Sequence, residues 1–297
     1  MLLLQLTLGC ALSHHPVLPS TLGAPASSAD LEALLDVPGP VKVETVASAD
    51  WEVPLSGLLD LSDPAAAGLQ DNPEPIQIYF HAIEHPDRGL FLVDTGVERA
   101  LRDHPDQAAI RGLVARAMHP ERMVIQAPLG EWLGGRGVAG VLLTHLHLDH
   151  ISGMADVPAG TPIYTGPGET GAKSAQNLLL RSTTDRELDG KGEIQEWAFQ
   201  PDPTGTFRGV MDVFGDGSVW ALWLPGHTPG STAYVARTPD GPVLLTGDVC
   251  HTRWGWDHGV GPGTFSADRE AGGQSLDALH ALVDRHPGMD VRLGHQR

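Results

Sequence analysis

The sequence predicts an α/β fold made of two similar halves, each combining β-strands with a helix. Three observations support this prediction: alternating apolar residues near 76–93, helical spacing near 97–118, and a second set of strand-like runs in the C-terminal half. Many of these runs end in turns that contain glycine. A chain of 297 residues suits one large domain or two small ones and is long enough to bury a sizeable core.

The first half begins with a predicted β-hairpin. Apolar residues occupy every second position of its first strand, as in a half-buried strand: Ile76, Ile78, Phe80 and Ala82. Glu84–Gly89 is expected to turn, and Leu90–Val93 to return as the partner strand. Residues from about Val97 to Met118 then have helical character, with Ile110, Leu113, Val114 and Ala117 on one face.

The second half repeats this order. Ser231–Arg237 and Val243–Thr246 predict another hairpin around the turn Thr238–Gly241. Ser275 is expected to cap a final helix, which Pro287-Gly288 ends. The apolar stripe of that helix consists of Leu276, Leu279 and Val283.

The segment His145-Leu146-His147-Leu148-Asp149-His150 follows the apolar run Val138–Leu143. Neutral imidazole and carboxylate are the usual ligands of zinc and related divalent ions. Alternate side chains of an extended segment share a face, so His145 and His147 can bind one ion. A turn just beyond would present Asp149 and His150 to a second ion. Solvated histidines in a polar turn are the alternative, and the downstream partners argue against it.

Three further candidate ligands follow apolar strand-like runs, where functional residues of α/β scaffolds often lie. The runs and their ligands are Val219–Leu224 with His227, Val243–Thr246 with Asp248, and Asp290–Leu293 with His295. The whole set contains five histidines and two aspartates. These are enough ligands for two ions that share a bridging carboxylate.

Taken together, these motifs resemble those of the metallo-β-lactamase superfamily. The landmarks are Asp94-Thr95-Gly96 after an apolar strand, the His145–His150 segment, and the turn Gly226–Gly230, with Asp248 and His295 following in the expected order. The resemblance extends from about Val41 to His295. It implies a four-layer αββα sandwich with a two-metal site along one edge.

The resemblance also implies a role for each ligand candidate. His145, His147 and His227 would hold the first ion, and Asp149, His150 and His295 the second, with Asp248 bridging both. Asp94 would support the site from behind rather than bind metal. The implied cofactors are two divalent metal ions, with zinc as the expected metal, although such sites also accept manganese, iron or cobalt according to supply.

Such a centre predicts metal-dependent hydrolysis. Two divalent ions about 3.5–4 Å apart lower the pKa of a shared water toward 7, and the resulting metal-bridging hydroxide attacks an electrophilic carbon or phosphorus. Asp149 or Asp248 would carry the proton to the leaving group. The sequence contains no G-x-S-x-G motif that would suggest a serine nucleophile.

The substrate class is inferred from the ligand pattern. The best-known zinc β-lactamases place cysteine or serine at the position of Asp248. With an aspartate there, the ligand set instead resembles that of lactonases, glyoxalase II-type thioesterases and phosphodiesterases. We therefore expect opening of a small-molecule lactone or cleavage of a carboxylic ester, nearest to the quorum-quenching N-acyl homoserine lactonase branch. The alternatives are thioester or phosphodiester hydrolysis, and oxidation at a single iron as in persulfide dioxygenases.

Two residues close to Asp248 need separate interpretation. His251 lies three residues further on, where the lactonase relatives commonly hold a tyrosine that steadies the carbonyl oxygen under attack. It is expected to act similarly as a hydrogen-bond donor, and the alternative is a plain loop residue. Cys250 is expected to be a small buried filler and not a ligand. The other histidines are assigned structural or solvated roles. His14 and His15 fall in the predicted tether, and the rest are expected on the surfaces of strands, turns or helices: His81, His85, His104, His119, His280 and His286.

The composition excludes one class of partner. The formal net charge is −18, from 37 acidic and 19 basic residues, and no cluster of Lys or Arg offsets it. Such a surface repels phosphate backbones, so nucleic acid is not expected as a substrate. The sequence carries no signal for the oligomeric state.

The N-terminus predicts export. Met1–Leu12 is almost entirely apolar, too short to span a membrane but suited to the middle of a signal peptide. Thr7-Leu8-Gly9-Cys10 faintly resembles a bacterial lipobox, so Cys10 is a candidate lipid anchor. We therefore divide the chain into a signal-like segment and tether, residues 1–30, and a catalytic domain, residues 31–297. The expected location is periplasmic or lipid-anchored, with a cytoplasmic protein as the alternative.

Two irregular stretches are candidates for the walls of a substrate cleft. Gly166–Gly192 and His251–Gly273 are rich in glycine, and both follow ligand turns in the sequence. The second stretch carries Trp254 and Trp256, which either line the cleft or pack against the body of the fold.

Overall fold

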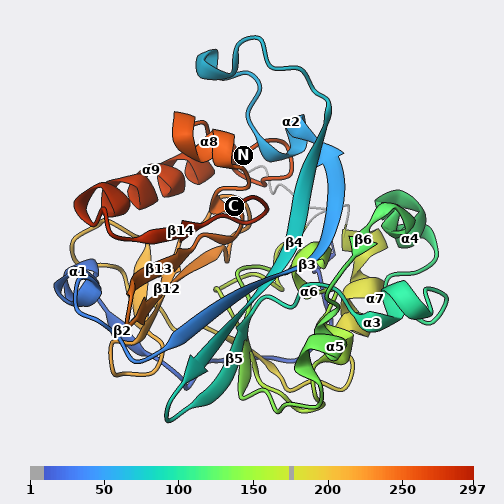
Figure 1. The fold of residues 1–297 in the computed structure, drawn as a ribbon, viewed down its shortest axis with the longest axis horizontal. Coiled ribbons are helices and arrows are strands. Elements are labelled where there is room, and N and C mark those ends of the chain that lie inside the picture. The colour runs from blue at the N-terminus through green and yellow to red at the C-terminus, as the bar shows by residue number, and fades with distance from the viewer. Residues whose placement is uncertain (1–9, 174–176) are drawn as a thin grey trace, which may run out of the picture.

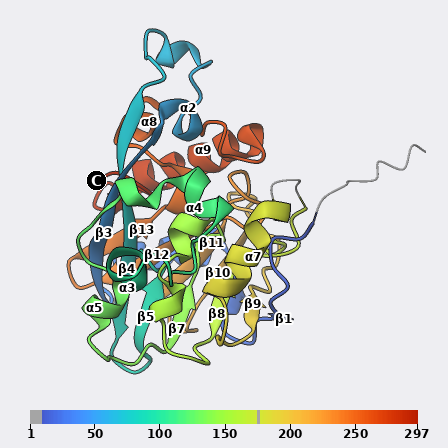
Figure 2. The ribbon, with the colours of Figure 1, turned by 90° about the vertical axis from the view of Figure 1, so that its right-hand side faces the viewer.

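The computed structural model describes residues 10–173 and 177–297. Two β-sheets pack face to face, and helices cover the outer face of each sheet (Figures 1 and 2). This arrangement is the αββα sandwich that the sequence predicts.

The first sheet has eight strands and mixed direction. From edge to edge it contains β1 (Val17–Pro19), β9 (Ile194–Glu196), β8 (Ile163–Thr165), β7 (Gly140–Leu142), β5 (Gly89–Val93), β4 (Pro73–His85), β3 (Lys42–Pro54) and β6 (Val124–Ile125). The strands from β1 to β5 run parallel to their neighbours, and those from β5 to β6 run antiparallel.

The second sheet has six strands. In spatial order they are β14 (Asp290–Arg292), β13 (Gly241–Leu245), β12 (Thr232–Thr238), β11 (Val219–Trp223), β10 (Gly209–Asp212) and β2 (Ala24–Ala26). Among the described strands of this sheet, β13 and β14 pair in parallel and the other neighbours pair antiparallel.

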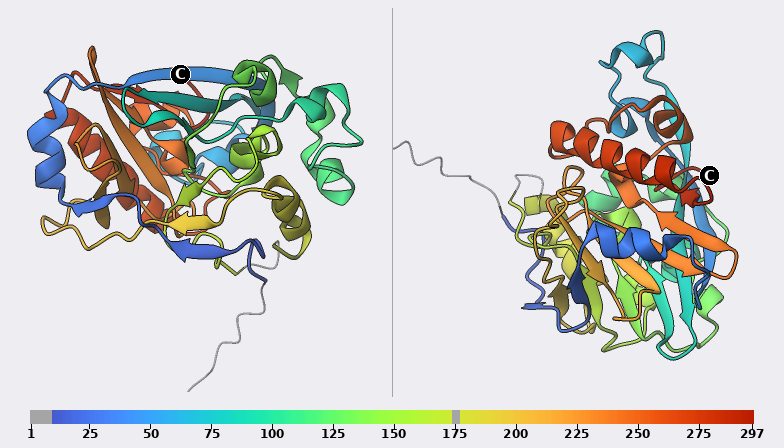
Figure 3. Two further views of the ribbon diagram at one scale, coloured as in Figure 1. Left: turned by 90° about the horizontal axis from the view of Figure 1, so that it is seen from below. Right: turned by 90° about the vertical axis from the view of Figure 1, so that its left-hand side faces the viewer.

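The helices divide between the two outer faces (Figure 3, left). The first sheet is covered by α3 (Arg99–Asp103), α4 (Leu113–Met118), α5 (Leu129–Leu133), α6 (Leu148–Ile151) and α7 (Asn177–Glu187), and the second by α1 (Ser28–Leu35) and α9 (Arg269–Arg285). The remaining helical segments are α2 (Leu55–Leu58), α8 (Arg253–His258), and the single 3₁₀ turns η1 (Pro64–Ala66), η2 (Pro120–Arg122), η3 (Met154–Asp156) and η4 (Gly247–Val249).

Three apolar layers hold the four structural layers together. The central layer lies between the sheets and joins Ile83 and Val93 to Tyr234 and Leu245. One outer layer packs Leu129 and its neighbours against the first sheet, and the other packs α9 and α1 against the second. Because both faces of each sheet are covered, the central strands β7, β8 and β12 are buried along their whole length.

Both predicted hairpins are confirmed. β4 and β5 pair antiparallel around a turn at residues 86–88, shorter than predicted because Glu84, His85 and Gly89 belong to the strands, and β12 and β13 pair around Pro239-Asp240. The alternation at Ile76–Ala82 correctly identifies a strand, but β4 is buried on both faces and not half-buried. The reason is that the second sheet covers the face opposite to Phe80.

Two helix predictions were wrong in their extent. Val97–Met118 forms only α3 and α4, because Pro105 removes a helical N–H donor and Gly112 adopts a φ of 69° before α4. The last helix begins two turns earlier than Ser275, with Asp268 as its N-cap accepting a hydrogen bond from Ala271 N–H. Its predicted end before Pro287 is correct.

The predicted tether, which follows the apolar Met1–Leu12 and runs to Asp30, is also corrected. Val17–Pro19 extends the first sheet beside β9, Ala24–Ala26 extends the second beside β10, and α1 starts at Ser28 with Ser27 and Asp30 forming a capping box. This segment therefore joins both sheets. The signal-like residues 1–9 lie outside the described residues, so export stays a prediction. Within the described chain, no helix is both long and apolar enough to cross a membrane.

A buried carboxyl group at the end of α7 makes the stability of the folded protein depend on pH. Glu187 has no exposed surface. Burial raises the pKa of its side chain well above the ordinary value of 4.5, and nearby Glu98 and Asp156 raise it further while Arg186 opposes them. Burial also raises the pKa of Glu98 to about 7. The folded protein therefore holds protons that the unfolded chain releases, and stability falls as the pH rises above 4.5.

We predict that Glu187→Gln stabilises the protein at pH 8 but has little effect near pH 5. Glutamine cannot ionise, so the variant avoids a penalty that grows by at most about 1.4 kcal/mol per pH unit between the unfolded and folded pKa values. Urea unfolding at both pH values measures the difference. Glu193→Gln, at an exposed position, is the control. A difference in unfolding free energy that is independent of pH would contradict this prediction.

Candidate metal centre

The predicted ligands come together where strands of both sheets end. His145 follows β7, His227 follows β11, Asp248 lies in η4 after β13, and His295 follows β14. α6 begins directly after His147 and turns the chain so that Asp149 and His150 face the same region. In the second sheet β13 and β14 are parallel, and β11 runs in the same direction because the antiparallel β12 separates it from β13, so these three strands end at the same edge.

The first group of ligand atoms belongs to His145, His147 and His227. His227 Nε2 lies 3.1 Å from His145 Nε2, 2.8 Å from His147 Nδ1 and 3.4 Å from Asp248 Oδ2. Around a tetrahedral zinc ion with bonds of about 2.0–2.1 Å, ligand atoms are about 3.3–3.4 Å apart. These atoms are therefore spaced closely enough to share one ion.

The second group consists of Asp149, His150, Asp248 and His295. His150 Nε2 lies 3.3 Å from Asp248 Oδ1, and His295 Nε2 lies 3.3 Å from Asp248 Oδ2 and 3.4 Å from Asp149 Oδ2. Its two imidazoles and two carboxylates fit a divalent cation. Asp248 faces both groups, one oxygen toward His150 and the other toward His227 and His295.

Unpartnered polar atoms support metal binding here. His150 Nε2 and Asp248 Oδ1 are buried and make no hydrogen bond within the described protein. Buried polar atoms are nearly always satisfied by hydrogen bonds or by coordination, so these two atoms, 3.3 Å apart, are available to coordinate a bound ion. A pair of divalent ions fits this set of donors.

The first three histidines are held neutral. Burial lowers the pKa of His145 and His227 well below the usual range, and the surrounding imidazoles lower both further. Burial also lowers the pKa of His147, although Asp149 and Asp248 oppose it. Neutral imidazole is the form that coordinates metal.

The second group carries opposite charges in the metal-free protein. Burial would lower the pKa of His150, but Asp248, Asp94 and Asp149 together raise it well above its usual range. For His295, Asp248 likewise outweighs burial and raises the pKa. Burial would raise the pKa of Asp248, but His295, His150 and His251 bring it well below its usual range. The pocket thus favours positive charge beside Asp248, which a bound cation would also supply.

Asp94 lies behind the ligands, where the resemblance places it. It adopts a φ of 56° and is 4% exposed. One oxygen accepts hydrogen bonds from the Thr144 hydroxyl and from His150 Nδ1, each at 2.8 Å, and the other accepts from Thr144 N–H. Because Nδ1 of His150 is engaged, its Nε2 points toward Asp248.

Other ligands are oriented in the same way. His295 Nδ1 donates to the Gln77 carbonyl at 2.9 Å, and His227 Nδ1 lies 3.0 Å from Ser266 Oγ. The backbone at Gly294 also lies very close to the Asp248 side chain, because a Cβ at this position would be 2.3 Å from Asp248 Oδ1. Glycine before His295 therefore leaves room for the carboxylate.

Sequence reasoning missed Glu169, which connects the two loops that carry the first ligand group. Its carboxylate is 1% exposed and accepts hydrogen bonds from Leu146 N–H at 3.0 Å and from Gly230 N–H at 2.9 Å. Leu146 lies between His145 and His147, and Gly230 lies in the turn after His227. Glu169 lies in a polar, glycine-rich loop and does not belong to any motif that contains a candidate ligand. No signal in the sequence therefore identifies it.

The two residues near Asp248 occupy different environments. His251 is 2% exposed and faces the cluster, with Nε2 3.3 Å from Asp248 Oδ2 and neither ring nitrogen in a hydrogen bond within the described protein. It forms a third group of close ligand atoms with His227 and Asp248. Cys250 is buried in the core beneath α9 and belongs to none of these groups. Its expected role as a filler fits this position.

The remaining histidines join none of the three ligand groups found among the described residues. His81, His85 and His286 are nevertheless buried, where a surface position was expected. Each has a polar partner elsewhere: Thr45 for His81, Asp216 for His85, and Asp36 for His286. Their structural interpretation stands, but their surface placement was wrong.

The cluster opens into a pocket of about 310 Å³. Its polar lining comes mainly from the cluster itself, and the rest is largely apolar. Both predicted wall stretches contribute, through Leu180 and Thr184 and through Thr264 and Phe265. Trp254 and Trp256 do not line the pocket: Trp254 stacks on His258, and Trp256 packs against His280 and the core beneath α9.

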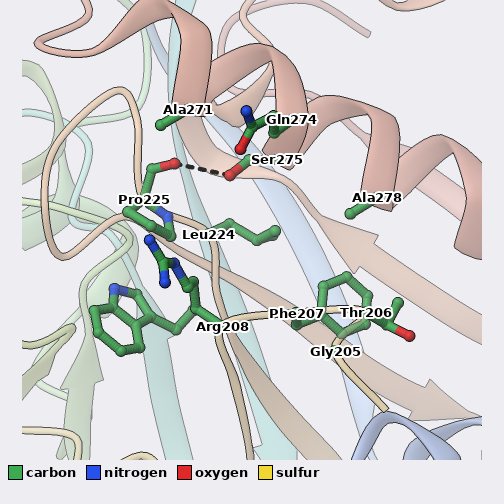
Figure 4. Close-up of a pocket in the computed structure, with 11 residues that line it drawn as sticks. Gly205, Thr206, Phe207, Arg208, Leu224, Pro225, Ala271, Gln274, Ser275 and Ala278 are labelled. Carbon is green, nitrogen blue, oxygen red and sulfur yellow. Dashed lines mark hydrogen bonds between the residues drawn. The ribbon is translucent and has the colours of Figure 1, made fainter. Parts of the chain in front are cut away.

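A second cavity, of about 380 Å³, lies between α9 and the second sheet and shares no lining residue with the first (Figure 4). Ser275, expected to be a helix cap, lies inside α9 there and donates a hydrogen bond to the Pro225 carbonyl at 2.8 Å. A Cβ at Gly226 would lie 2.3 Å from Gly272 Cα. Through these contacts α9 supports the turn that carries His227.

We predict that Glu169→Gln weakens zinc binding by about 10- to 100-fold, the usual effect of removing a group that orients metal ligands. The amide can accept from only one of the two N–H groups, which releases one ligand loop. Competition with a chromophoric chelator measures the affinity, and Glu52→Gln, at an exposed position of β3, is the control. If Glu169 were merely structural, the variant would melt at a lower temperature with and without zinc by equal amounts, and zinc affinity would not change.

Comparisons with known proteins agree with this geometry. A family profile described as the metallo-beta-lactamase superfamily matches residues 74–282. The chain is 26% identical to N-acyl homoserine lactonase AttM of Rhizobium johnstonii, over 74% of this chain and 82% of that protein. It is 29% identical to AttM of Agrobacterium fabrum over 52% of this chain and 57% of the relative.

Solved structures share the fold at lower identity. A variant of AiiA from B. thuringiensis with N-decanoyl-L-homoserine at its active site is 19% identical, with a TM-score of 0.58, covering 86% of this chain and 93% of that one. AidC, a dizinc quorum-quenching lactonase, is 12% identical, with a TM-score of 0.56 and coverage of 93% and 92%. From the family match, the common fold and the ligand arrangement together, we conclude that this chain belongs to the metallo-β-lactamase superfamily.

Proposed function

We propose that this protein is a dinuclear metal-dependent hydrolase that opens a lactone or cleaves a carboxylic ester. The observation that carries the proposal is the pair of ligand groups that share Asp248 at the base of an apolar pocket. The relatives named as N-acyl homoserine lactonases support the lactone as the first substrate class to test.

The donor geometry supports the following metal assignment. His145, His147 and His227 would hold one ion, and Asp149, His150 and His295 the other, with Asp248 between them. Zinc is the proposed metal, because these nitrogen and carboxylate ligands suit it and the ligand spacing fits tetrahedral bonds. When bound, two such ions supply a water that is acidic enough to attack at neutral pH and polarise the substrate carbonyl.

The protein's own residues position the substrate and move protons. Asp149 lines the pocket with its side chain 21% exposed, so it can take a proton from the attacking water and return it to the leaving alkoxide. Asp248 is almost fully buried and is better placed to hold the two ligand groups together. The apolar walls exclude bulk water, which strengthens the electrostatic interactions inside.

His251 is proposed as the donor to the carbonyl oxygen under attack. Neither of its ring nitrogens makes a hydrogen bond within the described protein, and the side chain lines the pocket. A donor aimed at an oxygen that gains charge in the transition state contributes about 10²–10³-fold to the rate. The competing role is that of an additional metal ligand, which its distance to Asp248 permits.

The pocket lining also bears on the alternatives. Among its lining residues there is no Lys or Arg, so no cationic side chain is present to bind a phosphodiester. A thioester fits the same site and stays an alternative, as does oxidation at a single iron. Metal content together with the reaction product separates these functions.

Export is also retained as a proposal, supported by the apolar N-terminus. The chain from Val17 onward is part of both sheets. A processed protein that keeps this fold would therefore be cleaved or lipidated at or before Cys10.

We predict about two divalent ions per chain and acid release from acyl-homoserine lactones, both lost in Asp248→Ala. Plasma mass spectrometry of the purified protein and a pH-stat assay measure these quantities, with simple aryl esters as additional substrates. Asp240→Ala, in the turn between β12 and β13, is the control. A single iron ion without acid release from any lactone or ester would contradict the proposal.

We further predict that His251→Phe lowers kcat by about 10²-fold with unchanged metal content, whereas His251→Tyr keeps most of the activity because it retains a donor. Steady-state kinetics and metal analysis of the same preparations test this. Loss of metal from either variant would identify His251 as a ligand and rule out the donor role.

A further inference from the structure

The segment after Cys10 lies against the pocket and contributes a side chain to it. Leu12 is among the residues that line the pocket and is 7% exposed. Its N–H donates to the Thr170 carbonyl at 3.1 Å, and the Asn177 side chain donates to the Cys10 carbonyl at 3.0 Å. The hydrogen bonds of the Leu12 N–H and of the Cys10 carbonyl therefore hold the backbone around Leu12 beside the start of α7.

The residues that follow fix the segment more firmly. Ser13 Oγ donates to Asp185 Oδ1 at 2.6 Å, and His14 N–H donates to the same oxygen at 2.8 Å. His14 Nδ1 lies 2.9 Å from Asp185 Oδ2. Further along, β1 pairs with β9 in the first sheet. The backbone around Leu12 is thus anchored to α7 on one side and leads into the sheet on the other.

The part of the pocket around Leu12 is apolar. Met118 of α4 and Leu180 of α7 also line the pocket and belong to the same apolar cluster as Leu12. On the other elements the lining includes Trp51 of β3 and Phe265. This surface is suited to an uncharged aliphatic or aromatic group, since each methylene buried against it favours binding by about 4-fold.

We propose that Leu12 is a specificity-determining residue: it forms one wall for the apolar tail of the substrate, and its size sets the preferred tail length. The proposal rests on the hydrolase function proposed above and adds to it the residue that selects among substrates. Leu12 touches the tail and not the reacting carbonyl, so it changes which substrate is preferred without taking part in the chemical step.

The competing explanation is that Leu12 only fills the core. The two explanations differ in what a smaller side chain does. A core filler affects the folded fraction, and thus the rate with every substrate equally. A wall of the substrate site affects long and short tails differently, because removing three carbon atoms leaves space for additional methylenes of the tail.

The test compares kcat/KM across N-acyl homoserine lactones from butanoyl to dodecanoyl, and across the matching aryl esters. Leu12→Ala should shift the optimum toward longer tails, with a gain in the long-to-short ratio of about 4-fold for each additional methylene accommodated. Leu12→Trp should shift it toward shorter tails. Leu18→Ala, at an exposed position of β1 in the same segment, should leave the profile unchanged.

The ratio between two substrates on one preparation does not depend on the folded fraction, so a variant that is partly unfolded still tests the proposal. An identical length profile in the wild type and in both Leu12 variants would overturn the specificity role, even with lactone opening intact. If the wild type opens no lactone and cleaves no ester, the proposed function itself fails, and this inference fails with it.

Discussion

The structure depends on the placement of one carboxylate, Asp248, among imidazole side chains. Its oxygens lie between 3.3 and 3.8 Å from nitrogens of five histidines, at a position that is 5% exposed. Such a charge is costly to bury unless it is balanced by positive charge. In the metal-free protein this balance comes from the imidazoles of the second group, whose pKa values Asp248 raises, whereas the pKa values of His145 and His227 in the first group are lowered. The ends of β7, β11, β13 and β14 must therefore meet at one point.

The supporting contacts hold this arrangement from several elements. Asp94 orients His150, Glu169 joins the loops of His145 and His227, and α9 supports the His227 turn through Ser275. These groups come from both sheets and from an outer helix, so the two halves of the sandwich cannot move independently without disturbing the ligands. The open side of the cluster faces an apolar pocket, so the proposed metal centre and the proposed substrate-selecting surface would be adjacent but formed by different elements.

Much of the site was readable from the sequence because its ligands are local features. A histidine or aspartate directly after an apolar strand marks a strand end, and the spacing within His145–His150 reflects the geometry of a short turn. Glu169 and Leu12 could not be found in this way, because the contact of Glu169 with both ligand loops and the place of Leu12 in the pocket lining depend on residues distant in sequence. The error at residues 97–118 came from following apolar spacing across Pro105, and the tether prediction failed because short strands such as Val17–Pro19 gain their stability from the sheets they join.

The most direct test of this account is the position of the metal ions themselves. Anomalous diffraction from crystals of the zinc-loaded protein, measured at the zinc absorption edge, locates them without reference to activity. The account predicts two peaks about 3.5–4 Å apart, one on each side of the Asp248 carboxylate. A single peak, or a peak coordinated by a different set of side chains, would contradict it.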